Sequence, residues 1–75
     1  MDSESLGHRV REERRAQGLT QAQLAGLTGV GVRFVRELEA GKESCQLGRA
    51  LRVLAALGLE LSVERRQDGS LEPGA

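Results

Sequence analysis

Apolar residues recur every three or four positions in four stretches of the first 58 residues, and a glycine follows each stretch. This spacing places them on one face of a helix, so each stretch predicts an amphipathic helix. The apolar positions are Leu6 and Val10 before Gly18, Leu24 and Leu27 before Gly29, Val35 and Leu38 before Gly41, and Leu47, Leu51, Leu54 and Leu57 before Gly58. The predicted helices run from a Ser3 or Ser5 cap to about residue 17, and then over residues 20–28, 31–40 and 47–57. Ala50 and Val53 widen the last stripe, which predicts a well-buried fourth helix.

The middle of the chain, residues 21–40, predicts two helices joined by a tight turn. Thr20 precedes the first of them, and its hydroxyl can accept a hydrogen bond from an unpaired N–H of the first turn. Gly29 lies at the reversal, where a short turn often requires a positive φ, and Val30 follows as a buried residue. Val35 and Leu38 form the inner stripe of the second helix. This arrangement predicts a helix-turn-helix.

The hydrophobic period changes to two over residues 59–66, where Leu59, Leu61 and Val63 alternate with polar residues. Alternation of this kind predicts a half-buried β-strand. Because a lone strand leaves backbone groups unpaired, we expect it to pair with the same strand of a second copy. The alternative is a local hairpin that turns at Asp68 and Gly69. The predicted organisation is therefore a domain over residues 1–58, a dimerisation strand over residues 59–66 and a flexible tail over residues 67–75.

Composition excludes several classes of protein. The chain has 75 residues with one cysteine, Cys45, and one histidine, His8, so it has neither an internal disulfide nor the spacing of metal ligands. No orienting group accompanies these residues or the serines, and we expect no catalysis and no cofactor. The chain contains neither a secretory segment nor an apolar run that could span a membrane, and the lone cysteine favours a reducing compartment, so the predicted location is the cytoplasm.

The charge balance argues against a nucleic-acid partner at first sight. Eleven basic and eleven acidic residues give a formal net charge of zero, whereas phosphate contacts usually bring a basic excess. Charge on the docking face matters more than the total, and Arg33 and Arg36 can supply it locally. The near absence of aromatic residues argues against binding of single strands by base stacking.

Several positions in register resemble the Xre/Cro phage-repressor type of helix-turn-helix: Gly18-Leu19-Thr20-Gln21, Leu24-Ala25, Gly29-Val30, Val35, Leu38-Glu39 and Gly41-Lys42. The last predicted helix runs directly into the predicted strand as RALRVLAALGLELSVE, which resembles the HipB-like antitoxins. The resemblance implies a mainly α domain of four to five helices with one C-terminal strand that pairs across a dimer. It also implies that Glu39 has a structural role, paired with an arginine such as Arg14.

The exposed face of the second motif helix supplies the candidate base contacts: Val32, Arg33, Arg36 and Glu37. Arginine recognises guanine through O6 and N7, and valine can contact only a thymine methyl group. Glu37 can accept from cytosine or orient Arg33 four residues away, and we favour the second role. The candidate phosphate contacts are Thr20, Gln21, Gly31 and Lys42, of which Gln21 is implied by the resemblance. Gly31 offers no hydroxyl where the family often has serine or threonine.

The function predicted from the sequence is a dimeric repressor that binds a palindromic operator in double-stranded DNA. The HipB-like resemblance implies an autoregulating antitoxin whose partner is a HipA-type kinase toxin. The alternatives are a stand-alone Xre-type regulator and a subunit that acts mainly by binding a partner protein, for which the zero net charge, Val32 and the polar tail are suited.

Overall fold

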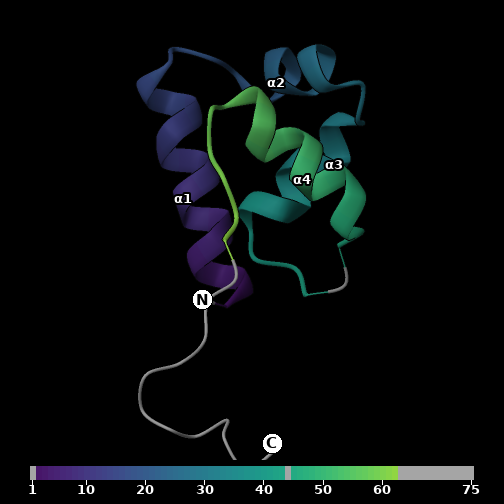
Figure 1. The fold of residues 1–75 in the computed structure, drawn as a ribbon. Helices are drawn as coiled ribbons and strands as arrows, with labels where there is room; N and C mark the ends of the chain where they lie inside the picture. The colour runs from purple at the N-terminus through teal and green to yellow at the C-terminus, as the bar shows by residue number, and fades with distance from the viewer. Residues whose placement is uncertain (1, 44, 63–75) are drawn as a thin grey trace, which may run out of the picture.

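The computed structural model describes residues 2–43 and 45–62, and this part of the chain contains four α-helices (Figure 1). They are α1 (Ser3–Ala16), α2 (Gln21–Thr28), α3 (Val32–Glu39) and α4 (Leu47–Ala56). Helix α3 packs on α1 and α2, and α4 packs on α2. The four predicted helices and the mainly α class are therefore confirmed.

The helix ends follow from local hydrogen bonding. Thr20 caps α2 as predicted: its hydroxyl accepts from the backbone N–H of Gln23 at 3.0 Å, and the Gln23 side chain accepts from the Thr20 N–H at 2.8 Å. This reciprocal pair is a capping box. Gly29 ends α2 with a φ of 76°, which confirms the predicted left-handed turn.

The predicted cap of α1 was wrong. Asp2, rather than Ser3 or Ser5, caps this helix, and its carboxylate accepts from the Ser5 N–H at 2.8 Å. A carboxylate at this position also interacts favourably with the positive end of the helix dipole, which a serine hydroxyl does to a smaller extent. The hydrogen bond from the Ser5 backbone holds the pKa of Asp2 below its ordinary value.

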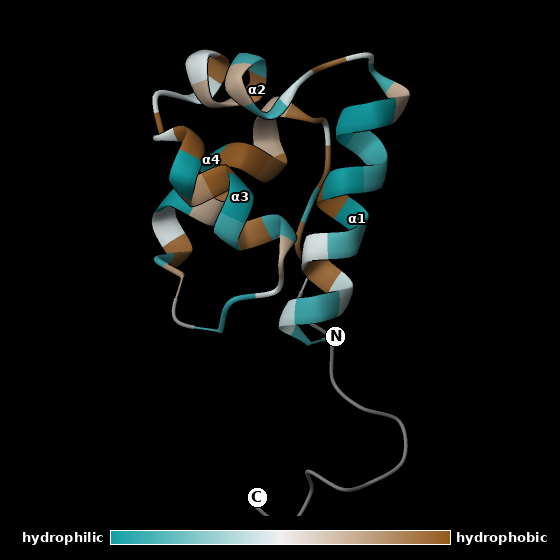
Figure 2. Cartoon of the chain, turned by 180° about the vertical axis from the view of Figure 1, so that it is seen from behind, coloured by the Kyte–Doolittle hydropathy of each residue, from teal (hydrophilic) through white to brown (hydrophobic). Residues whose placement is uncertain are grey.

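Residues from all four helices and from the turn after α2 form one hydrophobic core. Its buried members are Val10, Leu24, Ala25, Val30, Val35, Leu38, Ala50, Val53, Leu54 and Leu57. Figure 2 shows α1 as a largely hydrophilic helix interrupted by hydrophobic bands, as a helix with one covered face requires. The predicted burial of Val30, Val35 and Leu38 is confirmed.

Two of the predicted apolar stripes are displaced. Leu27 is 67% exposed, because the buried face of α2 is formed by Leu24, Ala25 and Thr28 and Leu27 falls outside it. In α4, Leu47 is 63% exposed and Leu51 is 41% exposed. The buried positions of that helix and its cap are Ala50, Val53, Leu54 and Leu57. They recur at intervals of three and four residues on one face, so Leu47 and Leu51 fall on a neighbouring face.

The segment after α4 runs beside α1 in both views of the chain (Figures 1 and 2). The Leu59 N–H donates to the Leu54 carbonyl at 2.8 Å, the Leu59 side chain packs against the core, and Leu61 is 44% exposed. The side-chain amide of Gln17, at the end of α1, donates to the Leu57 carbonyl at the end of α4 at 2.9 Å. Residues 59–62 form no strand within the described part of the chain, and the rest of the predicted strand, including Val63, lies outside it together with the alternative hairpin and the tail.

Helices long and apolar enough to cross a membrane are absent from residues 2–43 and 45–62.

Candidate nucleic-acid interface

Helix α3 presents its first turns to solvent. Val35 and Leu38 are buried on its inner side, whereas Val32 is 39% exposed and the Arg33 side chain is 87% exposed. Arg36, one turn after Arg33, is also exposed. The structure therefore places the predicted outward residues at the surface, as a helix that enters a DNA groove requires.

Glu37 joins two cations beside this surface. Its Oε2 atom lies 3.3 Å from Arg33 Nε, and its Oε1 atom lies 3.4 Å from Lys42 Nζ. Both carboxylate oxygens of Glu37 are thus paired within the protein. This arrangement favours an orienting role for Glu37, the role predicted from its position four residues after Arg33.

The start of α3 has no side-chain cap. Gly31 occupies the N-cap position in extended conformation and is exposed, and the amides that follow it are those of Val32 and Arg33. Phe34, the only aromatic residue of the sequence, is half-buried and packs against the core. Because Gly31 is exposed and has no side chain, an anion could approach the backbone there closely, but no hydroxyl would help to bind it.

A buried ion pair lies behind α3 and joins it to α1, and a hydrogen bond joins the same carboxylate to α2. Arg14 of α1 donates from Nε to Glu39 Oε2 at 2.6 Å and from Nη2 to Glu39 Oε1 at 3.0 Å, and its Nη1 donates to the Leu19 carbonyl at 2.8 Å. The Gln21 side-chain amide donates to Glu39 Oε1 at 3.1 Å. The hydrogen bonds to Glu39 raise the pKa of Arg14 above its already high ordinary value. The predicted pairing of Arg14 with Glu39 is confirmed, and Gln21 is bound to the same carboxylate.

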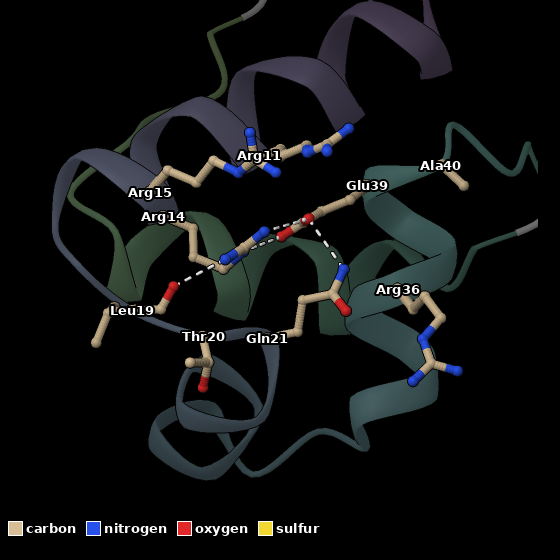
Figure 3. Close-up of a pocket in the computed structure, with 9 residues that line it drawn as sticks. All are labelled: Arg11, Arg14, Arg15, Leu19, Thr20, Gln21, Arg36, Glu39 and Ala40. Carbon is tan, nitrogen blue, oxygen red and sulfur yellow. Dashed lines mark hydrogen bonds and ion pairs between the residues drawn. The ribbon is translucent and has the colours of Figure 1, made fainter.

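An open hollow of about 560 Å³ lies on the surface where α1, the start of α2 and the end of α3 meet (Figure 3). Four arginines and one carboxylate contribute to its lining, which consists of Arg11, Arg14, Arg15, Leu19, Thr20, Gln21, Arg36, Glu39 and Ala40. Figure 3 shows Arg11 and Arg15 extending from α1 on one side and Arg36 from α3 on the other. The hollow therefore adjoins the exposed face of α3 and carries a strong excess of positive charge.

Two arginines of the hollow were not predicted as functional residues from the sequence. Neither Arg11 nor Arg15 is among the contacts predicted from the sequence. They stand four residues apart without an acidic residue four positions away, in contrast to Arg9, which pairs with Glu13 at 3.5 Å. The absence of an acidic residue four positions from either arginine is the signal that could have identified them.

The remaining candidate residues do not gather into a site. His8 is exposed and lies 3.2 Å from Glu12, and Cys45 is half-buried against the core. Across residues 2–43 and 45–62, no three His, Cys, Asp or Glu side chains are placed to hold a metal ion. The Lys42 side chain is 49% exposed and Thr20 is exposed, so both are accessible to a ligand.

Comparison with known proteins identifies similar chains. A family model described as helix-turn-helix matches residues 10–63, a range that includes α2, α3, α4 and the second half of α1. The chain is also similar to a protein of Sinorhizobium fredii with the name "Uncharacterized HTH-type transcriptional regulator y4mF". The two are 46% identical over 66 residues, which cover 83% of this chain and 87% of that protein.

Proposed function

The chain belongs to the helix-turn-helix family and is a DNA-binding transcriptional regulator, and we propose that it is a repressor that reads a palindromic operator as a homodimer. The observation that carries the proposal is the exposed start of α3, where Arg33 has 87% of its side chain in solvent beside the partly exposed Val32. A helix with buried Val35 and Leu38 and an outward arginine in its first turn is suited to the major groove. The chain would act in the cytoplasm by binding, without catalysing a reaction.

In this proposal Arg33 binds the O6 and N7 atoms of guanine, and Val32 contacts the methyl group of thymine. Glu37 positions Arg33 and Lys42 through its two ion pairs. Thr20, Gln21, Gly31 and Lys42 remain the proposed phosphate contacts beside the groove. They lie at the starts of α2 and α3 and just after α3, where backbone amides or a lysine side chain can meet the anionic strand.

Binding of two duplexes tests this assignment. The first duplex is selected by the wild-type protein from a random-sequence pool, and the second is a scrambled version of it. Arg33→Ala is expected to weaken binding to the selected duplex by about 5- to 150-fold, since a bidentate arginine–guanine contact is worth about 1–3 kcal/mol of discrimination. The scrambled duplex should lose much less. Arg49→Ala, which removes an exposed arginine of α4, is the matched control.

Equal losses on both duplexes would exclude base recognition by Arg33. A wild-type protein that selects no preferred sequence from the pool would contradict the proposed sequence-specific repressor.

The homodimer is supported by apolar surface that a monomer leaves in solvent. Leu47 and Leu51 are one turn apart on α4, and both are exposed, as is Leu61 in the segment that follows. Two copies are also needed to place two recognition helices about one helical turn of DNA apart, roughly 34 Å. We propose that the predicted strand with Leu59, Leu61 and Val63 adds to this interface, although Leu59 already packs against the core of its own chain.

The antitoxin role is the finer proposal, and it rests on the resemblance of residues 49–64 to HipB-like regulators. Its partner would be a HipA-type kinase toxin encoded beside this chain. A neighbouring kinase reading frame whose product copurifies with the chain would support the antitoxin. Absence of such a gene would leave the stand-alone regulator.

A further inference from the structure

We propose that Arg11, Arg15 and Arg36 form a clamp for a phosphodiester group of the DNA backbone, in the hollow between α1, the start of α2 and the end of α3. The proposal rests on the proposed function and extends its footprint from the two helices of the motif to α1. It also assigns Arg36, a candidate base contact, to the backbone.

The carboxylate of the hollow is fully paired, whereas three of its arginines have no carboxylate partner within the described residues. Glu39 is the one carboxylate of its lining, and Arg14 and Gln21 occupy both of its oxygens. Arg11, Arg15 and Arg36 have no carboxylate within 4 Å among residues 2–43 and 45–62, whereas Arg9, Arg33 and Lys42 each have one. The clamp arginines could therefore bind an external anion without breaking an ion pair of the described residues.

The clamp arginines lie close enough to repel one another when no ligand is bound. Arg11 and Arg15 are four residues apart on α1, where like charges destabilise a helix. Arg36 brings a third positive charge to the same hollow from α3. A bound anion would relieve this repulsion, and the planar guanidinium group is well matched to two oxygens of a phosphate.

The start of α2 also lines the hollow, through Thr20 and Gln21, and supplies hydrogen-bond donors there. The capping box uses the N–H groups of Thr20 and Gln23, and the Leu24 N–H donates to the Thr20 carbonyl. The N–H groups of Gln21 and Ala22 have no hydrogen-bond partner within the described part of the chain, as is usual in a first helical turn. Arginine side chains from two helices and the start of α2 thus line the same hollow beside the exposed face of α3.

The position of the hollow indicates which anion it would bind. It borders the helix that would enter the major groove, and the sugar-phosphate backbone forms the edge of that groove. Phosphates are also the groups to which most protein–DNA hydrogen bonds are made. A phosphodiester beside the bases read by Arg33 would therefore lie within reach of the clamp.

The test is the salt dependence of binding to the scrambled duplex, measured by fluorescence anisotropy between 50 and 200 mM NaCl. Each phosphate contact contributes about 0.9 to the slope of log K against log salt concentration. Since the clamp binds one phosphodiester, the double variant Arg11→Ala/Arg15→Ala is expected to lower the magnitude of this slope by about 0.9 and to leave the ratio of affinities for the selected and scrambled duplexes unchanged. Arg36→Ala should lower the slope by up to about 0.9 with the same unchanged ratio.

Arg9→Ala is the matched control, since it removes the same charge from α1 outside the hollow and should leave the slope within about 0.3 of the wild-type value. Thermal unfolding by circular dichroism confirms that each variant is folded at the assay temperature. If the double alanine variant fails to fold, Arg11→Gln/Arg15→Gln removes the same two charges while keeping long side chains, and it should lower the slope by the same amount.

Two results would overturn the clamp. One is a folded double variant, with alanine or with glutamine at both positions, whose slope equals that of Arg9→Ala. The other is a collapse of the affinity ratio in Arg36→Ala, which would place that arginine on a base. Because the slope is measured on the scrambled duplex, it tests the clamp even if the wild-type protein shows no sequence preference and the proposed function fails.

Discussion

Arg14 is 8% exposed, so its charge lies almost wholly inside the protein. Removal of an ion from water is unfavourable, and the guanidinium group tolerates it here because Glu39 accepts two of its hydrogen bonds and the Leu19 carbonyl accepts a third. In residues 2–43 and 45–62, no buried side-chain nitrogen or oxygen lacks a hydrogen-bond partner. Each member of this network therefore depends on the others.

Removal of the carboxylate alone should destabilise the domain severely. Glu39→Ala leaves Arg14 charged and buried without its anion, and we expect a loss of about 3 kcal/mol in the free energy of unfolding, measured by urea denaturation. Arg14→Leu/Glu39→Leu removes both charges and should be less destabilised than the sum of Arg14→Leu and Glu39→Leu. Additive losses in this cycle would show that the two side chains are not energetically coupled.

At the scale of the element, α1 approaches the end of α3 closely at one glycine. Gly7 is buried, and a Cβ atom at this position would overlap the Leu38 carbonyl oxygen and lie 2.8 Å from the Glu39 carbonyl oxygen. These atoms belong to the backbone of α3, so they cannot move aside as a side chain would. Gly7 thereby permits the contact that brings Arg14 to Glu39.

Alanine substitutions at two glycines should therefore have opposite effects. Gly7→Ala improves helix propensity by about 1 kcal/mol but forces α1 away from α3, and overpacking of this kind costs about 1–3 kcal/mol. We expect a net loss of stability in urea denaturation. Gly26→Ala in α2 is the control, because a Cβ there meets nothing within 4 Å, and this variant should gain up to about 1 kcal/mol. A Gly7→Ala variant as stable as Gly26→Ala would contradict the close contact.

The sequence predicted those features of the elements that depend on neighbouring residues. The Thr20 cap, the Gly29 turn and the inner stripe of α3 depend on local geometry, and the structure confirms them. The exposure of Leu27, Leu47 and Leu51 could not be predicted from spacing alone, since four-residue periodicity fits two neighbouring faces of a short helix equally well. The hollow was missed for a related reason: it exists only after α1 packs beside α2 and α3.

At the scale of the whole molecule, the net charge is zero, but the positive and negative side chains are distributed unevenly over the surface. Glu12 and Glu13 pair with His8 and Arg9 along α1, away from the lining of the hollow. The arginines without a carboxylate partner in the described residues include the three that surround the hollow beside α3. The argument from composition against a DNA partner fails because Glu39 is the one carboxylate among the described residues that lines the hollow, and the other acidic side chains of this part of the chain lie outside that lining.

The exposed stripe of α4 leads to the last prediction, which concerns self-association. If Leu47 and Leu51 form the dimer interface, Leu51→Glu should convert the dimer to a monomer in sedimentation experiments, because it places a charge in a buried apolar contact. Leu27→Glu alters an exposed leucine of α2 and serves as the control.

A truncation that ends at Gly58 separates the two proposed parts of the interface. A truncated dimer that Leu51→Glu dissociates would assign association to α4, whereas a truncated monomer would assign it to the segment that begins at Leu59. A wild-type chain that is monomeric at every concentration would contradict the homodimer, and the exposed leucines would then have to be covered by a different protein.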